Sequence, residues 1–396
     1  MTVYLDHAAS TPLRVEARDA WLDATGVVGN ASSVHRDGQA ARSLLEGARE
    51  QVARAMGCDP IEVLFTSGGT ESVNAALKGL WWGRPPATES IVLPDGEHHA
   101  TLDTVEWLRS TEKATVRAVP LTPLGAVDIA AFVRQLPGSA LATALVANNE
   151  VGTLSEATRM AEAAADADVA LHLDAVGAAG ILDVQFSVWR GRSRAPSGLV
   201  ALSLSGHKVG APVGTGALLV SRHARIAPLV HGGGQQRGLR AGTQDIAGAA
   251  ALAAALTAAV AERDEVSARL VTLRQRLIDG VRRTVPAAEL LGDPRHRLPG
   301  NAHFRFPGAA GETLLFLLDQ RGVSVSTGSA CQAGVTEPSH VVLALGRDER
   351  AARSVLRFTL GRGSTAEDVD VLLAALPEAY ERAVAAGGGP SRLISS

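Results

Sequence analysis

The sequence predicts an α/β protein, with a large domain built on a mainly parallel sheet covered by helices and a smaller C-terminal α/β domain. Short apolar runs alternate with helix-length segments through the first half of the chain, which is typical of parallel strands joined by helices. The 396 residues are too many for one small core. A long alanine-rich helical stretch, 246–285, precedes a second group of strands and helices.

The composition indicates a globular protein that acts on small molecules and other proteins. The formal net charge is −3 and no block of like charge occurs, so no surface for nucleic acid or anionic lipid is expected. No apolar run reaches the roughly 18–20 residues of a membrane span, and no secretion signal is expected. Cys58 and Cys331 are the only cysteines. Their spacing predicts no metal site and a reducing compartment, so we expect a cytoplasmic protein.

The N-terminal region is expected to be an extended arm followed by two helices. Residues 4–11 read as a short strand or arm that breaks at a proline, and 15–25 as a short helix. The polar stretch 29–38 is predicted to be irregular, either a surface turn or a functional loop. An amphipathic helix is expected over 39–56.

The next unit combines a strand, a glycine turn and the beginning of a helix. An apolar strand at 63–66 leads into the sequence S-G-G-T at 67–70, and a helix is predicted over 71–80. Backbone N–H groups at such a helix N-terminus bind phosphate, and the hydroxyl groups of Ser67 and Thr70 would add to them. A plain strand-to-helix turn is the alternative, since any such turn tolerates glycine.

The remaining strands of the first half end in polar residues. The predicted strands are 91–94, 116–120, 140–146, 170–173 and 199–204, and the helices among them are 101–110, 129–136 and 155–167. Ligands bind at the carboxyl ends of such strands. There lie His98, Asn149, Asp174 and Lys208. A buried Asp174 needs a positive partner, and His98 either ligates a metal or stacks on an aromatic ligand.

Lys208 lies within S-G-H-K, just after a buried strand and among small residues that leave room for a flat molecule. This is a plausible position for a lysine that forms an imine with a cofactor aldehyde. The alternative is a solvated loop lysine, because most lysines are exposed. Residues 183–197 read as a surface excursion, and the loop 231–243, rich in glycine and arginine, suits an active-site edge or a subunit contact.

The smaller domain is expected to contain strands at 301–306 and 355–359. Its helices are predicted at 311–321, 338–344 and 366–384. The small residues of 323–334 surround Cys331, whose thiol is either buried packing or an exposed nucleophile on a loop. We expect a large domain over 14–250, a smaller domain over 1–13 and 251–385, and a disordered tail over 386–396.

Several short motifs follow one another in a recognisable order. They are Y-L-D-H-A-A-S-T, G-N-A-S-S-V-H, F-T-S-G-G-T-E-S, E-H-H-A, N-N-E-V-G-T, H-L-D-A, S-G-H-K, H-G-G-G-Q-Q-R-G-L-R-A-G-T, S-T-G-S-A-C and R-F-T-L-G. This series resembles the cysteine desulfurases, pyridoxal 5′-phosphate (PLP) enzymes of the class V aminotransferase group with fold type I. The long stretch after S-T-G-S-A-C is similar to the subgroup with an extended cysteine loop, which serves iron–sulfur clusters and tRNA thiolation.

The resemblance implies a role for each matching residue. Lys208 would carry PLP as an imine, Asp174 would pair with the pyridinium nitrogen, His98 would stack on the ring, and Asn149 would lie near the ring hydroxyl. The implied phosphate ligands are Gly69, Thr70, Ser205 and His207, with Thr243 from the other subunit of a homodimer. Arg357 would bind the substrate carboxylate, with Asn30 nearby. Cys331 would attack the substrate sulfur and could be a transient iron–sulfur ligand.

The implied activity is conversion of L-cysteine to L-alanine, with the sulfur held as a persulfide on Cys331 for an acceptor protein in iron–sulfur assembly or thiolation. Alternatives are a selenocysteine lyase, another class V lyase or aminotransferase, and a PLP-binding docking protein with reduced catalysis. One position departs from the family: Gly177 stands where a glutamine usually donates a hydrogen bond to the ring hydroxyl.

Overall fold

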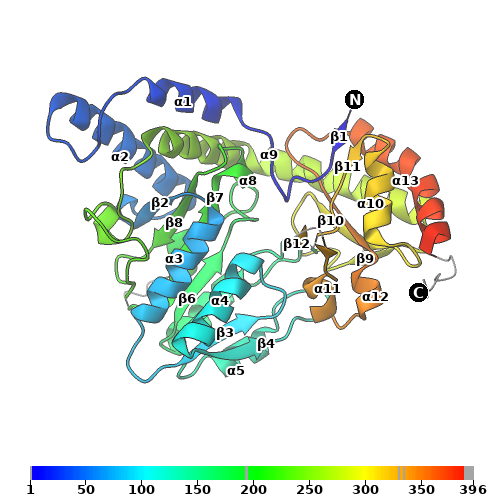
Figure 1. Cartoon of the computed structure of the whole chain (residues 1–396), viewed down its shortest axis with the longest axis horizontal. Helices are drawn as coiled ribbons and strands as arrows, with labels where there is room; N and C mark the ends of the chain where they lie inside the picture. The colour runs from blue at the N-terminus through cyan, green and yellow to red at the C-terminus, as the bar shows by residue number, and fades with distance from the viewer. Residues whose placement is uncertain (1, 192–194, 329–330, 333–334, 388–396) are drawn as a thin grey trace, which may run out of the picture.

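A computed structural model describes residues 2–191, 195–328, 331–332 and 335–387 (Figure 1). It confirms the expected α/β class. The seven strands of the larger sheet lie side by side in the order β2 (Val63–Thr66), β8 (Gly216–Val220), β7 (Gly198–Ser205), β6 (Ala170–Asp174), β5 (Leu141–Leu145), β3 (Ser90–Pro94) and β4 (Thr115–Val119). The last five of these are parallel, whereas β8 is antiparallel to both of its neighbours. Their carboxyl ends therefore meet at one edge of the sheet, where ligands bind in such folds.

Helices cover both faces of this sheet. They are α1 (Val15–Thr25), α2 (Arg36–Met56), α3 (Gly69–Trp82), α4 (His99–Glu112), α5 (Ile129–Gln135), α6 (Ala157–Asp166), α7 (Phe186–Arg190) and α8 (Gly206–Val209). Because side chains alternate along a strand, Leu218 and Val220 pack under α3 and α4, while Ala217 and Leu219 pack into the core on the opposite face. Short 3₁₀ helices occur at Pro60–Glu62 and Gln236–Gly238.

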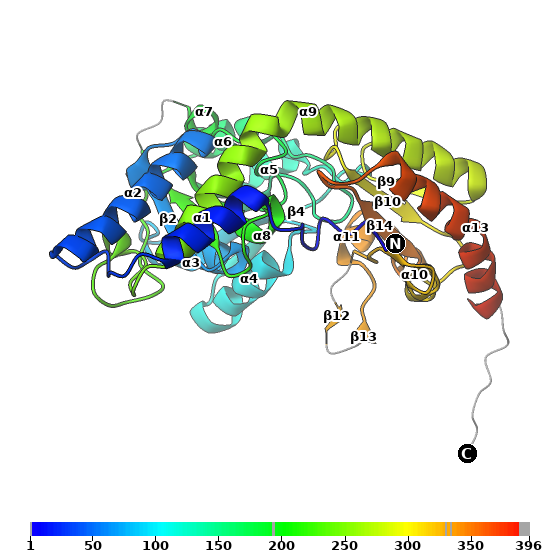
Figure 2. The same cartoon turned by 90° about the horizontal axis from the view of Figure 1, so that it is seen from above.

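Helix α9 (Ile246–Thr284) connects the two parts of the protein (Figure 2). Its residues from Ala249 to Leu256 belong to the core of the large sheet, and those from Leu270 to Val281 belong to the second core. Among the described residues, α9 is the one helix long and apolar enough to span a membrane by length and composition. Its apolar residues instead fill the two protein cores. The expected boundary at 250/251 falls within this helix and stays a prediction.

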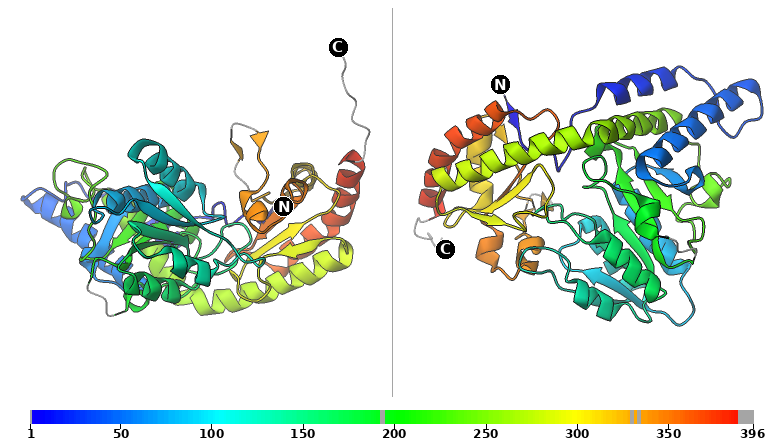
Figure 3. Two further views of the ribbon diagram at one scale, coloured as in Figure 1. Left: turned by 90° about the horizontal axis from the view of Figure 1, so that it is seen from below. Right: turned by 180° about the vertical axis from the view of Figure 1, so that it is seen from behind.

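The second core lies under a three-stranded antiparallel sheet, β14 (Val355–Thr359), β10 (Asn301–Arg305) and β9 (Glu289–Leu291). Helices α10 (Gly311–Asp319), α11 (His340–Ala344), α12 (Glu349–Ala352) and α13 (Ala366–Gly387) complete this part. The N-terminal strand β1 (Val3–Tyr4) pairs in parallel with β11 (Val323–Ser324). The chain then runs back to α1, which lies along the first half of α9 with α2 (Figure 3).

The backbone of Cys331 lies in a small hairpin. Strand β12 (Cys331–Gln332) pairs with β13 (Val335–Thr336), and the hairpin extends away from the smaller sheet (Figure 2). The sequence predicts a loop here, whereas the structure has two short strands. Residues 329–330 and 333–334, and 388–396 of the expected disordered tail, lie outside the described residues.

Several elements differ from the expectation. Strand β8 is absent from the prediction, although its run G-A-L-L-V is wholly buried, because a short apolar run is ambiguous without its neighbours. Residues 183–197 were expected to be a surface excursion, but α7 lies within them. This helix forms because the side chain of Phe186 is buried in the core of the large sheet. Helix α2 begins at Arg36 rather than 39, since His35 caps it by accepting a hydrogen bond from the Gly38 N–H at 3.2 Å.

Candidate active site

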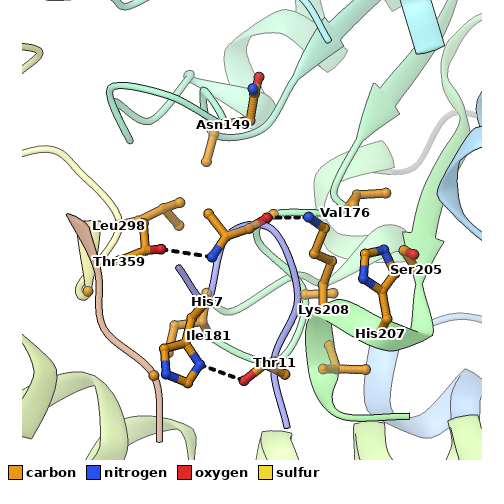
Figure 4. A pocket seen from close by; sticks show the side chains of 18 of the residues that line it. His7, Thr11, Asn149, Val176, Ile181, Ser205, His207, Lys208, Leu298 and Thr359 are labelled. Carbon is orange, nitrogen blue, oxygen red and sulfur yellow. Dashed lines mark hydrogen bonds between the residues drawn. The ribbon is translucent and has the colours of Figure 1, made fainter. Parts of the chain in front are cut away.

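A cavity of about 320 Å³ lies at the carboxyl ends of the large sheet, between that sheet and the smaller domain. Its wall is formed by the N-terminal arm, the ends of β5, β6 and β7, helix α9 and the end of β14. Figure 4 shows Lys208 and His207 on one side of it, with Leu298, Thr359 and His7 of the arm on the other. This is the size and position expected of a small-molecule site.

Lys208 projects into the cavity from α8, one short turn after β7 ends. Its Nζ donates hydrogen bonds to the carbonyl oxygens of Ala8 and Ala9, the second at 3.0 Å. Burial and, to a smaller extent, the guanidinium of Arg357 lower the pKa of this ammonium group from 10.5 to about 8, against the opposing effects of Asp6 and Asp174. The amine is therefore far more available as a nucleophile near neutral pH than that of an exposed lysine.

Asp174 ends β6 and faces the same cavity, with 3% of its surface exposed. Its Oδ1 accepts a hydrogen bond from the Val176 N–H at 2.8 Å. Burial raises the pKa of the carboxyl group to about 6. Among the described residues, no basic side chain lies within ion-pair distance of it. A buried carboxylate without a counter-ion fits a ligand that brings a positive charge.

His98 and Asn149 also line the cavity. His98 caps α4, its Nδ1 accepting from the Ala100 N–H at 3.1 Å, and burial lowers the pKa of its imidazole to about 4. The ring is therefore neutral at physiological pH and free to lie against a flat ligand. The side-chain oxygen of Asn149 is buried without a hydrogen-bond partner in the protein, which leaves an acceptor for a bound molecule.

The N-terminus of α3 faces the cavity. Gly69 and Thr70 make up its first turn, and Ser205 and His207 contact the same cavity. A Cβ atom on Gly69 would lie 2.7 Å from Cγ2 of Val176, so no side chain fits at this position. The free N–H groups of a helix N-terminus, together with these side chains, can hold a phosphate.

Arg357 lies on β14 beside the cavity but does not line it. Its Nη2 forms an ion pair with Asp6 of the N-terminal arm at 3.0 Å, and its Nη1 donates to the backbone oxygen of Asn149 at 2.8 Å. The guanidinium Nε is buried without a partner. A charged group adjacent to the cavity with a free donor suits an anionic part of a ligand.

Eight of the predicted residues therefore converge on one cavity. They are Gly69, Thr70, His98, Asn149, Asp174, Ser205, His207 and Lys208. Asn30 and Thr243 are exposed and do not line it, and the side-chain oxygen of Asn30 accepts from the Ser32 N–H at 2.9 Å. Cys331 is placed only through its backbone, in β12.

The prediction missed residues whose partners are distant in sequence. Asp6 was part of a recognisable motif, but only the fold places it on Arg357. Glu97 is fully buried near Asp174; its Oε1 accepts from the Leu145 N–H at 2.8 Å and its Oε2 has no partner. Burial raises the pKa of Glu97 to about 8, so it is mostly protonated at pH 7. Glu97 belongs to the motif E-H-H-A, but its burial and its unpartnered oxygen depend on the fold.

Gly177 lines the cavity, three residues after Asp174. An added Cβ would have one neighbour within 4 Å, the Ala147 oxygen at 4.0 Å. Its backbone does not have a positive φ angle. A side chain therefore fits at position 177 without strain. The described residues contain no group of three or more histidine, cysteine or acidic side chains arranged to hold a metal ion.

Comparison with known proteins gives concordant results. The family model for aminotransferase class V matches residues 3–372. An "IscS-like cysteine desulfurase" of Mycobacterium tuberculosis is 45% identical over 98% of this chain and 100% of that protein. A "Cysteine desulfurase IscS" of Methanosarcina thermophila is 37% identical over 96% and 92% of the two chains. Among solved structures, a "NifS-like protein" matches with a TM-score of 0.88 and 30% identity, covering 96% of this chain and 100% of that one.

Proposed function

We propose, from the premise that the chain belongs to the class-V aminotransferase family and is a PLP-dependent cysteine desulfurase, that it transfers the sulfur of L-cysteine to Cys331 as a persulfide. The observation that supports the proposal is the convergence of the Lys208 amine, the Asp174 carboxyl and the N-terminus of α3 on one cavity. These three groups match the aldehyde, the ring nitrogen and the phosphate of PLP. Asn149, whose side-chain oxygen has no partner in the protein, would lie near the ring hydroxyl.

When bound, PLP supplies an electron sink for the α-carbon of the substrate. Lys208 would hold the cofactor covalently and, once released, would move protons with an amine of pKa about 8. Asp174 would keep the ring nitrogen protonated, and the neutral imidazole of His98 would lie on the ring. Gly69, Thr70, Ser205 and His207 would bind the phosphate, with Thr243 of the partner subunit completing the set.

Arg357 would bind the substrate carboxylate, with Asn30 nearby. In the described chain its guanidinium is held by Asp6 and by the backbone of Asn149, which fixes its direction before substrate arrives. A carboxylate that uses the unpartnered Nε and shares the remaining donors would form charge-assisted hydrogen bonds. When no substrate is bound, the carboxylate of Asp6 would offset the positive charge of Arg357.

The sulfur-transfer step uses Cys331 as its thiolate. Its lone pair forms the S–S bond, the bond between the substrate β-carbon and sulfur breaks, and the electron pair of that bond stays with the carbon. The carbon is then protonated and leaves as the methyl group of alanine, while the sulfur remains as the outer atom of an enzyme persulfide. Oxidation of the sulfur is balanced by reduction of the carbon, so no external oxidant is required. An acceptor protein for an iron–sulfur cluster or a thiolation enzyme would then take this sulfur.

We also propose that the enzyme is a cytoplasmic homodimer. The loops around Asn30 and Thr243 share a hollow of about 450 Å³ lined by Ala31, Ser32 and residues from Gly233 to Arg237. Val28 and Val34 in the first loop are 85% and 88% exposed, which is unfavourable for apolar side chains in water. A second copy that covers these loops would bury both valines and would bring Thr243 to the other subunit's phosphate.

The dimer can be tested with two defective subunits. A Lys208→Ala subunit lacks the cofactor lysine, and a Thr243→Val subunit lacks the hydroxyl that it lends to its partner. In the mixed dimer, one site combines the intact Lys208 of the second subunit with the intact Thr243 of the first. We therefore expect mixing to restore normal PLP affinity at one of the two sites, measured by fluorescence titration of dissociated and reassociated subunits. A fully active monomer in sedimentation at low concentration would contradict the dimer.

Gly177→Gln is expected to tighten PLP binding, because its amide would reach the ring hydroxyl. A hydrogen bond to a charged acceptor contributes about 1.5–3 kcal/mol, so the gain is up to about a hundredfold in affinity. The added amide N–H would stabilise the ring oxyanion most when the imine nitrogen that joins Lys208 to PLP is unprotonated. The visible spectrum should therefore change to the neutral form at lower pH than in the parent. Unchanged affinity and an unchanged titration midpoint would contradict the prediction: position 177 then either faces away from the cofactor or is already served by an ordered water. Gly177→Ala is the matched control and should behave like the parent.

A further inference from the structure

Glu150 is a buried acidic residue that the proposed mechanism does not use. It follows Asn149 in the turn after β5, and 1% of its surface is exposed. The turn is held firmly: the Glu150 N–H donates to Oδ1 of Asn148 at 3.0 Å, and the Glu150 backbone oxygen accepts from Nδ2 of Asn301 at 3.0 Å. The Glu150 side chain therefore starts from a fixed backbone position next to the cavity.

The carboxyl group of Glu150 contacts both ends of the segment that carries Cys331. On the side that follows Cys331 in sequence, the Ser339 hydroxyl donates to Oε2 at 2.5 Å, and the same hydroxyl caps α11 by accepting from the Val342 N–H at 3.1 Å. On the side that precedes it, Gly328 packs against the carboxyl group so closely that an added Cβ would lie 3.2 Å from Oε2. One side chain thus lies between Gly328 and Ser339.

Other contacts hold the same two ends beside the cavity. Ser326 and Arg357 exchange backbone hydrogen bonds of 2.6 and 3.3 Å, and Nε2 of His340 lies 2.8 Å from the backbone oxygen of Glu97. These contacts restrain each end separately, whereas the Glu150 carboxyl group contacts Gly328 on one side and Ser339 on the other. Loss of this carboxyl group would remove a direct link between the two ends and leave only the separate restraints.

We propose that Glu150 is a positioning residue that holds the two ends of the Cys331 segment together next to the cavity, and so sets how often the thiolate reaches the substrate. This inference rests on the proposed role of Cys331. A reactive group on a segment with fixed ends has a high effective concentration near those ends, and the concentration falls when one end is released. Glu150 is proposed to contact neither substrate nor cofactor. Its effect is therefore expected on the rate of sulfur transfer to Cys331 and not on the binding of PLP or L-cysteine.

The test compares Glu150→Ala with Glu150→Gln in the PLP-loaded enzyme. In a single turnover with ³⁵S-labelled L-cysteine and no reductant, Glu150→Ala should form the persulfide about 10²-fold more slowly, the size of effect that misplacement of a reacting group causes. Its PLP content and its KM for L-cysteine should equal those of the parent. Glu150→Gln keeps the volume and an oxygen that accepts from Ser339, so its rate should stay within about threefold of the parent, since it retains the hydrogen bond.

Two further measurements keep the result decisive. Ser354→Ala is the control, because it removes another buried serine hydroxyl of the smaller domain. This hydroxyl donates to the backbone oxygen of Arg350 at 2.8 Å and not to Glu150, so the variant should form the persulfide at the parent rate. Amide hydrogen exchange over 337–342 in the holoenzyme should be faster in Glu150→Ala than in the parent or Ser354→Ala.

The inference is overturned if Glu150→Ala forms the persulfide at the parent rate. It is also overturned if the slower rate is accompanied by loss of PLP or a higher KM, because Glu150 would then act on the cavity rather than on the segment. These outcomes are separate from a failure of the proposed function, which would appear in the parent enzyme as ³⁵S label on a residue other than Cys331.

Discussion

Lys208→Ala is expected to purify without covalently bound PLP and to lose at least about 10²–10⁴-fold in desulfurase activity, the usual contribution of proton transfer by a positioned group. The chain has only three lysines, which makes the test unusually clear. Lys78 lies over the ring of Trp107, with its Nζ 4.3 Å from the ring centroid, and Lys113 is exposed at the end of α4. Neither lines the cavity.

Borohydride reduction of the parent followed by peptide mapping should place the cofactor on Lys208. Because its pKa is about 8, roughly a tenth of this amine is unprotonated at pH 7, compared with well under a thousandth for a lysine of pKa 10.5. The rate at which the apoprotein takes up PLP should therefore rise with pH and level off above about pH 8. Cofactor trapped on Lys78 or Lys113 would contradict the assignment.

Cys331→Ala is expected to bind PLP and L-cysteine normally but to form no enzyme persulfide, with alanine production at least about 10²-fold slower because the positioned nucleophile is absent. Absorbance spectra would follow cofactor and substrate binding, and mass mapping after one turnover would locate the persulfide in the parent. A variant that desulfurates L-cysteine at the parent rate would show that the thiol is dispensable, as in a lyase.

Cys58→Ala is the control for this experiment. Burial, together with the nearby carboxylates of Glu62 and Asp59, raises the pKa of the Cys58 thiol to about 12. This thiol is therefore protonated at neutral pH and unreactive as a nucleophile. We expect Cys58→Ala to form the persulfide on Cys331 at the parent rate. A persulfide mapped to Cys58 would exclude the proposed mechanism.

The residues that could be predicted from the sequence are those whose position depends on local structure. Asp174 and Lys208 each follow an apolar run, and the carboxyl ends of parallel strands must meet at one edge, so their convergence follows from the alternation of strands and helices. Gly69 and Thr70 lie where a strand passes into a helix, which local glycine content also indicates. The α/β class could be predicted for the same reason, because strands and helices alternate along the first half of the chain.

Residues whose function depends on contacts between distant parts of the chain could not be predicted in this way. The partner of Arg357 is Asp6, and the carboxyl of Glu150 meets Ser339 across the junction between the two sheets. No periodicity encodes such pairs. The roles proposed for Asn30 and Thr243 would depend on a second copy of the chain, and the burial of Glu97 depends on the fold. The motif resemblance supplied roles for some of these residues, but their contacts required the fold.

The attachment of β1 to β11, and of Asp6 to Arg357 across 351 positions, constrains when the enzyme can assemble during synthesis. Ribosomes release about 5–20 residues per second, so the amino terminus waits on the order of tens of seconds for the strand that it needs. Until then the arm that supplies Ala8 and Ala9 lacks its contacts with β11 and Arg357, and the hydrogen bonds from Thr11 and Arg14 to His207 and Gly210 hold only its far end. Capture of PLP in its final geometry is thus a post-translational event, and nascent chains that stall before β14 should remain unable to retain the cofactor.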